Sequence, residues 1–365
     1  MTVLQVCAYG AEYPGNFIAS LEALEEALSK KGIRTIYAFI ERAANMPWCR
    51  AIQKRTKVYF LPEAHARILP RTYALFRKIY RENSVDFVHS HFELFDIPAT
   101  IMAPKNTKVF WHLHDPIDIN TIRRKRLTKL QYGTFSKRAS LLAVAEKYRK
   151  NVVDLGFPES QSHTILNGIN LNRIHTNAEH CVNKTYDFLT FGWDFYRKGD
   201  DVILKACDRL AAEGYSFRLL LNGNEKTWPE LDQYLEGRSP QYLQRGNPVS
   251  DINTLFADCN VFIQASRRET FSYAVCEAAY AGLPVISSDI AGLEWAHNVP
   301  TVSFFPSEDA DALYTLMKQY IESPTVQTSN LEIARQIIQE DYSLSAWTRN
   351  ILSAYGLSPL TSTKD

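Results

Sequence analysis

The sequence predicts an α/β protein made of two doubly wound domains, each with a parallel sheet, that face each other across a cleft. Short apolar runs alternate with amphipathic segments along the chain, which is typical of parallel β–α units. The alternation stops between residues 168 and 184, which are rich in Asn, Thr and His, and then restarts. The net charge changes sign there too: residues 1–170 carry 25 basic and 15 acidic side chains, whereas residues 171–365 carry 16 and 25. Both changes indicate a domain boundary.

In the first half of the chain, each short apolar run is interpreted as a buried strand. The run at residues 3–8 is followed by a helix that Gly32 ends, with apolar residues at helical spacing: Phe17, Ile18, Leu21, Leu24 and Leu28. Further strands are expected at residues 33–40, 57–61, 85–89, 108–113, 141–145 and 164–166. Helices are expected between some of them, at residues 72–81 and 126–138.

The second half repeats the pattern and ends in helices. Strands are expected at residues 186–191, 217–221, 261–264, 284–287 and 301–304. Helices are expected at residues 309–322, 331–340 and 344–355, followed by a polar tail after Gly356. In doubly wound sheets, ligands bind beyond the carboxyl ends of the strands, so the functional residues are sought there.

The composition excludes several classes of protein. A hydrophobic fraction of 45% and a charged fraction of 22% are those of a globular protein and exclude a disordered or fibrous chain. The six cysteines form no C-x-x-C pair, which excludes zinc-ribbon and thioredoxin-type sites and favours a reduced, cytosolic setting. We expect neither a signal peptide nor a spanning helix, because the N-terminus has no basic leader and no apolar run approaches about 20 residues.

The most informative stretch is residues 265–286. A strand is expected to end near Ala265, a loop carries Glu269, and a helix begins near Ser272, which is a favourable N-cap. The free N–H groups at such a helix start form an anion site. Glu277 lies one turn further along among small or apolar neighbours, so its buried carboxylate needs a hydrogen-bonding partner. The hydroxyls of a ribose or sugar would serve, and so would a nearby Lys or Arg.

This stretch resembles the signature of family 4 glycosyltransferases, which are retaining enzymes with the GT-B fold. Their signature is Pro-Ser-x-x-Glu-Gly-Phe-Gly with a second Glu eight positions on, followed by Ala-x-Ala-x-Gly-x-Pro-Val. Glu269 and Glu277 keep the spacing, and the sequel is kept at Ala279, Ala281, Gly282, Pro284 and Val285. Three positions depart from it: Ala265 stands for Pro, and Thr270 and Ser272 stand for the two Gly. The resemblance implies that Glu269 contacts a donor sugar and Glu277 the ribose of its nucleotide.

Other landmarks of the same family follow in the right order. They are Asp86-Phe-Val-His-Ser-His91, His112-Leu-His-Asp115, Asn167-Gly-Ile-Asn170, Lys198-Gly199, Leu221-Asn-Gly-Asn-Glu225 and Ala291-Gly-Leu-Glu294. The resemblance implies that Lys198 neutralises the donor diphosphate. The family's Gly-Arg, whose Arg also binds the diphosphate, is replaced by Gly192-Trp193. Arg197, Arg267 and Arg268 are the candidates to supply the missing charge, because guanidinium groups bind phosphate bidentately.

The resemblance also implies a set of site residues and a domain plan. The expected catalytic residues are His114 and Glu269. The expected donor-binding residues are Gly192, Arg197, Lys198, Asn222, Gly223, Arg268, Thr270, Phe271, Ser272, Tyr273 and Glu277; on the acceptor side they are Gly10, Tyr13, Gly15, His91 and Asp115. The expected plan is an N-terminal acceptor-binding Rossmann-like domain at 1–170, a linker at 171–184, a nucleotide-sugar-binding Rossmann-like domain at 185–342, a helix at 343–357 that returns to the N-terminal domain, and a tail at 358–365.

No metal or cofactor is expected. His89, His91, His112 and His114 end two strands and look superficially like metal ligands, but no acidic residue stands at ligand spacing. His112 and His114 are also expected to alternate across their strand. Asp309-Ala-Asp311 is interpreted as a first helical turn, where acidic residues are favourable, and the loop at residues 9–15 lacks the glycine order of a nicotinamide site.

We therefore expect a metal-independent retaining glycosyltransferase, of the kind that builds bacterial surface polysaccharides, moving a sugar from a nucleoside-diphosphate donor to a hydroxyl of a glycan or lipid-linked acceptor. Nucleic acid is not an expected partner. Two basic clusters, Arg71/Arg77/Lys78/Arg81 and Arg123–Arg126 with Lys129, predict a cytoplasmic protein with peripheral contact to the anionic inner face of the membrane. The alternatives are a non-catalytic accessory or glycan-binding subunit on this fold, and a nucleotide-sugar epimerase or a phosphorylase.

Overall fold

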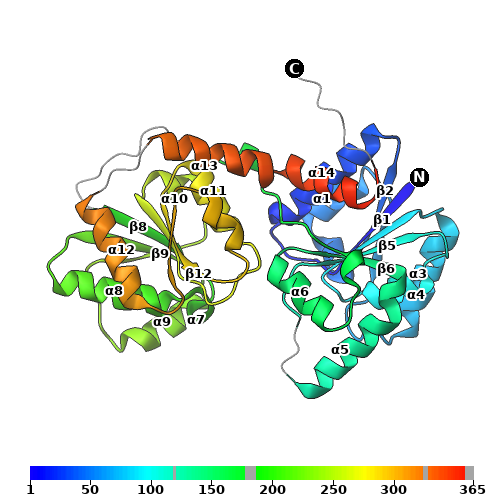
Figure 1. Ribbon diagram of the computed structural model, residues 1–365, viewed down its shortest axis with the longest axis horizontal. Helices are drawn as coiled ribbons and strands as arrows, with labels where there is room; N and C mark the ends of the chain where they lie inside the picture. Colours follow the sequence, from blue (N-terminus) through cyan, green and yellow to red (C-terminus); the bar gives the residue numbers. More distant parts are fainter. Residues whose placement is uncertain (118–120, 177–185, 324–327, 358–365) are drawn as a thin grey trace. The chain divides into compact units, whose positions relative to one another are not determined.

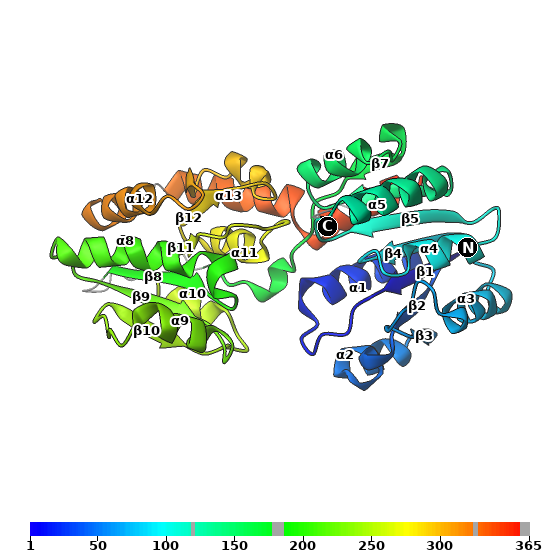
Figure 2. The ribbon, with the colours of Figure 1, turned by 90° about the horizontal axis from the view of Figure 1, so that it is seen from below.

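The computed structural model describes residues 1–117, 121–176, 186–323 and 328–357 (Figure 1). The chain divides into two compact units: unit 1 contains Met1–Gly168 and Leu344–Asp365, and unit 2 contains Ile169–Ser343. Each unit has one parallel sheet with helices on both faces (Figure 2). The predicted class, two doubly wound α/β domains, is confirmed.

Unit 1 contains a seven-stranded parallel sheet in the spatial order β3-β2-β1-β4-β5-β6-β7. The strands are β1 (Thr2–Cys7), β2 (Arg34–Ile40), β3 (Val58–Leu61), β4 (Phe87–His91), β5 (Lys108–Leu113), β6 (Ala139–Ala143) and β7 (Ser162–Thr164). The strand order reverses between β1 and β4, so the crevice beyond their carboxyl ends is the expected ligand position of this unit.

Helices cover both faces of this sheet. They are α1 (Gly15–Lys30), η1 (Glu41–Asn45), α2 (Pro47–Gln53), α3 (Pro70–Glu82), α4 (Asp96–Met102), α5 (Ile122–Phe135), η2 (Ser136–Arg138), α6 (Glu146–Asp154), η3 (Glu159–Gln161) and α14 (Leu344–Ala354). α14 lies beside α1 in Figure 1. Its Trp347 and Ile351 pack in one apolar cluster with Val3 of β1, Leu24 of α1 and Phe110 of β5. The last helix of the chain therefore completes the core of the first unit.

Unit 2 contains a six-stranded parallel sheet in the order β10-β9-β8-β11-β12-β13. The strands are β8 (Tyr186–Phe191), β9 (Phe217–Asn222), β10 (Leu243–Gly246), β11 (Val261–Gln264), β12 (Val285–Asp289) and β13 (Val302–Pro306). Its helices are η4 (Leu171–Arg173), α7 (Phe195–Lys198), α8 (Asp200–Ala212), α9 (Thr227–Leu235), α10 (Asn253–Ala257), α11 (Tyr273–Ala281), η5 (Glu294–Asn298), α12 (Ala310–Glu322) and α13 (Thr328–Asp341). The strand order reverses between β8 and β11. This is the second expected ligand position.

Most predicted strands are confirmed, with shifts of one or two residues. Prediction placed one strand at residues 85–89, but β4 runs over Phe87–His91 and therefore includes His91. The strand β10 was missed because its residues, Leu-Gln-Arg-Gly, are mostly polar and it forms an edge of the sheet. Much of the expected linker lies outside the described residues. Within the described ranges, no helix has the length and apolarity needed to cross a bilayer.

Candidate functional site

The β11–α11 loop lies at the switch point of unit 2. Ser272 caps α11, with its Oγ accepting a hydrogen bond from the Val275 backbone N–H at 3.5 Å, so the predicted cap is confirmed. The Ser272 backbone has φ = 58°, in the left-handed region that favours glycine. A Gly at this position would adopt the loop without that strain, and Ser pays a conformational cost in exchange for a cap.

Glu269 and Lys198, both predicted site residues, meet at this point. Lys198 Nζ, from the end of α7, lies 2.7 Å from Glu269 Oε1. Two further donors reach the same oxygen: Ser266 Oγ at 2.9 Å and Gln264 Nε2 at 3.0 Å. Lys198 is 6% exposed, so its charge is held in a largely desolvated place. The loops that follow β8 and β11 therefore bring a cation and a carboxylate together.

Of the three arginine candidates, Arg197 is the one that contacts Glu269. Its Nη1 lies 3.5 Å from Glu269 Oε1, and its guanidinium lies 4.2 Å from the centre of the Trp193 ring. Its Nη2 is buried without a hydrogen-bond partner. The aromatic residue at the family's arginine position thus stacks on an arginine supplied four residues later.

Arg267 is used elsewhere and Arg268 is exposed. The Arg267 guanidinium donates to both Asp201 oxygens, at 2.8 and 2.9 Å, and to Glu308 at 2.8 Å. These carboxylates, Asp201 foremost, raise the pKa of Arg267. Its charge is therefore already balanced. The Arg268 side chain is exposed, and its carbonyl accepts a bond from Arg197 Nη1 at 3.3 Å.

Three glycines shape the loops of this site. A Cβ on Gly199, whose φ is 73°, would lie 2.1 Å from the Ala265 carbonyl oxygen. A Cβ on Gly292, whose φ is 90°, would lie 2.3 Å from the Glu269 carbonyl oxygen. At Gly192 the obstacle would be Asp200 Oδ2, also at 2.3 Å. The loop that carries Glu269 is thus packed against backbone on two sides, which fixes its position.

Glu277 is 4% exposed and forms an ion pair with Arg173 of η4, with Nη2 3.1 Å from Oε1. The sequence left open whether a Lys or Arg, or the hydroxyls of a ligand, would satisfy this carboxylate. The basic partner is present. Arg173 was not predicted, because it lies 104 positions away in the sequence and carries no local pattern that points to Glu277.

The remaining predicted donor residues surround the same strand ends. Asn222 ends β9 and donates to the Asn247 carbonyl at 2.6 Å, and Gly223 follows it. Thr270 and Tyr273 are half-buried. Phe271 is buried and stacks on Trp295 with ring centres 4.9 Å apart, so its side chain belongs to the core and only its backbone is available to a ligand. Beyond the ends of β8, β9 and β10 lies a pocket of about 760 Å³ lined by Trp193, Asp194, Asn224, Glu225, Lys226, Glu230, Asn247 and Pro248.

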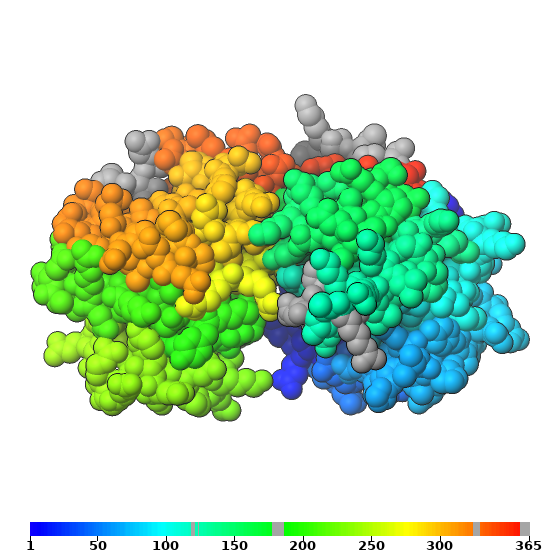
Figure 3. Space-filling view, turned by 60° about the horizontal axis from the view of Figure 1, so that its bottom comes forward, coloured from blue at the N-terminus to red at the C-terminus, as the bar shows by residue number. Residues whose placement is uncertain are grey.

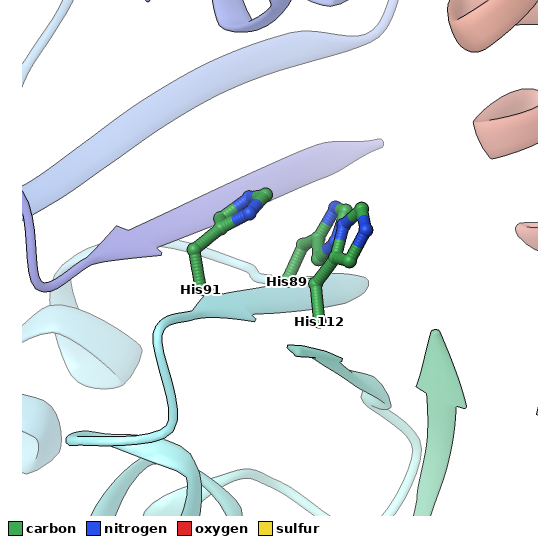
Figure 4. A group of neighbouring side chains, drawn as sticks. All are labelled: His89, His91 and His112. Atoms are coloured by element: carbon green, nitrogen blue, oxygen red, sulfur yellow. The ribbon is translucent and has the colours of Figure 1, made fainter. Parts of the chain in front are cut away.

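Unit 1 carries a different kind of cluster, made of four histidines. His89 and His91 project from β4 and His112 from β5, on the same side of the sheet (Figure 4). The rings of His112 and His114 stack with centres 4.3 Å apart. The expectation that these two residues alternate across the strand was wrong, because residues two apart share a face.

Hydrogen bonds join the four imidazoles to Gln5 and Tyr355. His89 bonds to the Tyr355 hydroxyl at 2.8 Å and to His112 at 3.1 Å. His91 bonds to His114 at 2.9 Å and to Gln5 Oε1 at 3.0 Å. Gln5 Nε2 donates to the Tyr355 hydroxyl at 3.3 Å and closes the network. Neither Gln5 nor Tyr355 was predicted, although a lone Gln inside an apolar strand was a usable signal.

Burial keeps these histidines neutral. Desolvation lowers the pKa of His89 and of His114 to about 3, and it lowers the pKa of His91 and His112 well below the usual value. His89, His91 and His112 are 0% exposed, whereas His114 keeps 8%. Any ligand that approaches the described side chains of this cluster therefore meets His114 first.

The histidines resemble a metal site in their spacing. One ring nitrogen from each of His89, His91 and His112 lies within 4.8 Å of the others. Both ring nitrogens of His89 and His91 already take part in hydrogen bonds, and His112 Nε2 is buried without a partner. All ring nitrogens of His89 and His91 thus have partners but His112 Nε2 does not, and the absence of a metal stays a prediction.

The residues expected on the acceptor side are spread over the loops of unit 1. Gly10 is buried, Gly15 begins α1 with φ = 57°, and Tyr13 is 61% exposed. Asp115 is exposed next to His114. His91 differs from the expectation: it is fully buried and contacts His114 instead of lying at the surface.

Comparisons with known proteins agree with this geometry. A family model described as glycosyltransferase family 4 matches residues 20–173, and one described as glycosyl transferases group 1 matches residues 186–323. WcaL of Salmonella typhimurium, a protein assigned by name to colanic acid biosynthesis as a glycosyltransferase, is 21% identical over 236 residues. That alignment spans 61% of this chain and 58% of the relative.

Solved structures share the whole fold. A glycosyltransferase from Rickettsia africae superposes with a TM-score of 0.80 at 18% identity, over 97% of both chains. Anabaena Alr3699/HepE, solved in complex with UDP and glucose, gives a TM-score of 0.76 at 16% identity, over 98% of this chain and 99% of the other. The lipopolysaccharide outer core galactosyltransferase WaaB gives 0.75 at 14% identity, over 98% of each. At these identities the likeness establishes the fold.

Proposed function

Because the chain belongs to the family 4 glycosyltransferases with the GT-B fold, we propose that it is a retaining enzyme that transfers a sugar from a nucleoside-diphosphate donor to a hydroxyl of a glycan or lipid-linked acceptor. The observation that carries this proposal is the meeting of Lys198, Arg197 and Glu269 beside the start of α11. These groups stand at the switch point of unit 2, where a doubly wound sheet binds its ligand. Unit 1, with His114 at the end of β5, binds the acceptor.

Two side-chain cations and a helix start supply the charge that a diphosphate leaving group requires. Lys198 and Arg197 are fixed by their contacts with Glu269 and Trp193, and Arg197 Nε also pairs with Asp194 at 2.8 Å. The Nη2 of Arg197 has no hydrogen-bond partner and is available to a phosphate. The free N–H groups at the start of α11 add a partial positive charge. Donors fixed in advance stabilise developing charge without reorganisation. Metal independence is therefore part of the proposal.

The proposed retaining mechanism uses Glu269 to position the donor sugar and not as a nucleophile. Four donors converge on its Oε1, namely Lys198, Ser266, Gln264 and, at 3.5 Å, Arg197. A carboxylate neutralised in this way is a poor nucleophile. The acceptor hydroxyl instead attacks the face from which the diphosphate departs, and the leaving phosphate takes its proton. Glu269 then positions the donor sugar.

A lipid-linked acceptor places the enzyme at a membrane surface, in the biosynthesis of a cell-surface polysaccharide on the cytoplasmic side. Helix α5 suits that setting. Ile122, Leu127 and Leu130 are 75%, 53% and 68% exposed, and α5 carries five basic residues and no acidic one. α5 lies at the surface of unit 1 in Figure 3 (teal). Exposed apolar side chains among cations are typical of helices that lie on anionic bilayers.

The membrane contact is tested by sedimentation with vesicles. We expect binding to vesicles that contain phosphatidylglycerol, weaker binding at high salt, and loss of binding in the I122S/L130S variant. The basic cluster on α3 provides the control, R77Q/K78Q, which leaves α5 unchanged. Binding that is insensitive to salt, or equal in both double variants, would contradict the role of α5.

The catalytic proposal is tested by a screen of nucleotide sugars for thermal stabilisation, followed by NMR of the product formed with a model acceptor. We expect stabilisation by one nucleoside diphosphate, a product with the anomeric configuration of the donor, and unchanged activity in EDTA. Failure of every nucleotide to bind would favour a non-catalytic subunit. Turnover of the donor without an acceptor would favour an epimerase or a phosphorylase.

A further inference from the structure

The ion pair between Arg173 and Glu277 joins two segments of unit 2 that lie far apart in the sequence, η4 and α11. Glu277 belongs to α11 and is surrounded by Val275, Cys276 and Ala278, which are 0% exposed. Arg173 belongs to η4, five residues after the boundary at Gly168 where unit 1 ends. The segment that enters unit 2 therefore supplies the cation for its most buried acidic contact near the proposed donor site.

Asn253 fixes the backbone on both sides of Arg173. Its Nδ2 donates to the Arg173 carbonyl at 2.9 Å, and its Oδ1 accepts from the His175 N–H at 2.7 Å. Asp251 holds this amide in turn, with Oδ1 2.6 Å from Asn253 Nδ2 and 3.0 Å from Asn253 N. These bonds from Asn253 lower the pKa of Asp251, which therefore stays ionised. Hydrogen bonds from Asn253 thus hold the backbone on both sides of the Arg173 side chain.

A buried carboxylate can serve two partners at once. Glu277 offers about four lone-pair sites on two oxygens, and the ion pair joins Arg173 to Oε1. A ribose diol brings two O–H donors. An ionised, oriented carboxylate can accept both of them, whereas a buried carboxylate without a cation binds a proton instead.

We propose that Arg173 is a positioning residue for donor recognition: it keeps Glu277 ionised and aimed so that the carboxylate accepts the 2′- and 3′-hydroxyls of the donor ribose. The inference rests on the proposed function and on the contact between Glu277 and that ribose which the family resemblance implies. The inference adds an account of how the protein would distinguish two kinds of nucleotide. Discrimination between a ribonucleotide and a 2′-deoxyribonucleotide depends on a residue that does not contact the base, the phosphates or the sugar being transferred.

The test is calorimetry with UDP and GDP, and then with the 2′-deoxy form of whichever one binds. Hydrogen bonds to a charged group predict that the wild-type protein prefers the ribonucleotide by roughly 10-fold to 100-fold. We expect R173Q to reduce this preference to about threefold or less, mainly by weakening binding of the ribonucleotide. R173K, which keeps the charge, should restore most of it.

The matched control is R218Q. Arg218 also pairs with a buried carboxylate, Asp187, at 2.7 Å, but the pair joins the amino-terminal ends of β8 and β9. We expect R218Q to lower the melting temperature at least as much as R173Q and to leave the ribose preference unchanged. A purely structural role for Arg173 would make the two variants alike in both measurements.

Each outcome decides a different claim. If the wild-type protein binds neither UDP, nor GDP, nor any other nucleoside diphosphate of the screen, the proposed function fails. If it binds and prefers the ribonucleotide, and R173Q keeps the full preference, the role of Arg173 is overturned. If R173Q does not fold, N253A provides the second variant, because it loosens the backbone clamp and leaves the ion pair chemically intact. A ribose preference that N253A leaves unchanged would then count against the proposal.

Discussion

The two units use the same architecture to hold opposite kinds of polar group. In unit 2, the strand ends hold charges: Lys198 with Glu269, and Arg173 with Glu277. In unit 1, the strands beside the switch point hold four neutral imidazoles, tied to Gln5 and Tyr355. The difference shows that a parallel sheet dictates where a site lies but not its electrostatics, which depend on how far each side chain is desolvated and on its partner.

The largest effect is expected from breaking the charged cluster. K198A removes the cation that is 2.7 Å from Glu269, and we expect kcat/KM to fall by roughly 10²–10³-fold, because a fixed donor to the leaving group is lost. The comparison variant is R267Q, which removes a cation already balanced by Asp201. Steady-state assays with the donor found in the nucleotide-sugar screen provide the measurement. Full activity in K198A with a native melting temperature would contradict the assignment.

Acid should destabilise unit 1 before unit 2. The folded-state pKa of His89 and of His114 is about 3, below the usual 6.5, so the stability that these groups contribute is present above pH 6.5 and is lost as the pH falls toward 3. Each histidine contributes about 1.4 kcal/mol per pH unit within that window. We expect the free energy of opening of β4 and β5, from hydrogen exchange corrected for intrinsic rates, to fall between pH 7 and pH 5.

The strands β8 and β11 provide the internal reference for that measurement. In unit 2, burial raises the pKa of Asp200, which adds stability as the pH falls, so the opening free energy of these strands should not decrease. Equal losses in the two sheets would show that the histidine cluster does not set the acid response. Y355F, which removes the hydroxyl bonded to His89, should add a loss in unit 1 of about 1 kcal/mol at pH 7.

Among the described residues of unit 2, Asp200 is a buried acidic residue without the ion pair that Glu269 and Glu277 form. Asp200 is 0% exposed, neither of its oxygens has a hydrogen-bond partner, and burial raises its pKa well above the usual value. A raised pKa means that stability is lost as the pH rises above about 3.8. The D200N variant cannot ionise at this position. We expect its free energy of unfolding, measured in urea at pH 8, to be at least about 1 kcal/mol higher than that of the wild-type protein. The gain should shrink toward pH 4; a gain that is constant with pH would point to packing.

The smallest effect is expected at the start of α11. S272G removes the cap but relieves the left-handed backbone, so the free energy of unfolding should change by less than about 1 kcal/mol. S272A loses the cap and keeps the strained φ, and should cost about 1–2 kcal/mol. Thermal unfolding of the two variants compares them directly. A larger loss in S272G than in S272A would show that the backbone conformation is not strained.

The alternation of apolar runs was enough to predict the two sheets, because buried parallel strands need little more than short hydrophobic segments. It missed β10, whose side chains are largely exposed, and it set β4 two residues too early, because the polar His91 reads as the end of a strand. The family resemblance predicted the roles of Glu269, Lys198 and Glu277, and these roles stay predictions. It could not choose among the three arginines, since that choice depends on which carboxylates lie beside each one in space.

The residues that the sequence analysis missed are the hydrogen-bond and ion-pair partners of the predicted residues. Gln264 and Ser266 precede Glu269 by five and three positions and donate to its carboxylate. Arg173 and Tyr355 reach their carboxylate and imidazole across more than a hundred positions. Such pairs leave no periodic or local pattern in one sequence, so only the fold reveals them.

The place of α14 has a consequence for how the molecule is made. The first segment of unit 1 is synthesised before unit 2, yet the core of unit 1 contains Trp347, Ile351 and Tyr355, which are synthesised after unit 2. At about 5–20 residues per second, roughly 10–40 s separate the end of the first segment of unit 1 from the arrival of this helix. During that interval the face of β1, β4 and β5 that carries the histidines lacks its cover. Synthesis of unit 1 thus begins before that of unit 2 and ends after it, so the whole of unit 2 must be synthesised before the core of unit 1 can be completed.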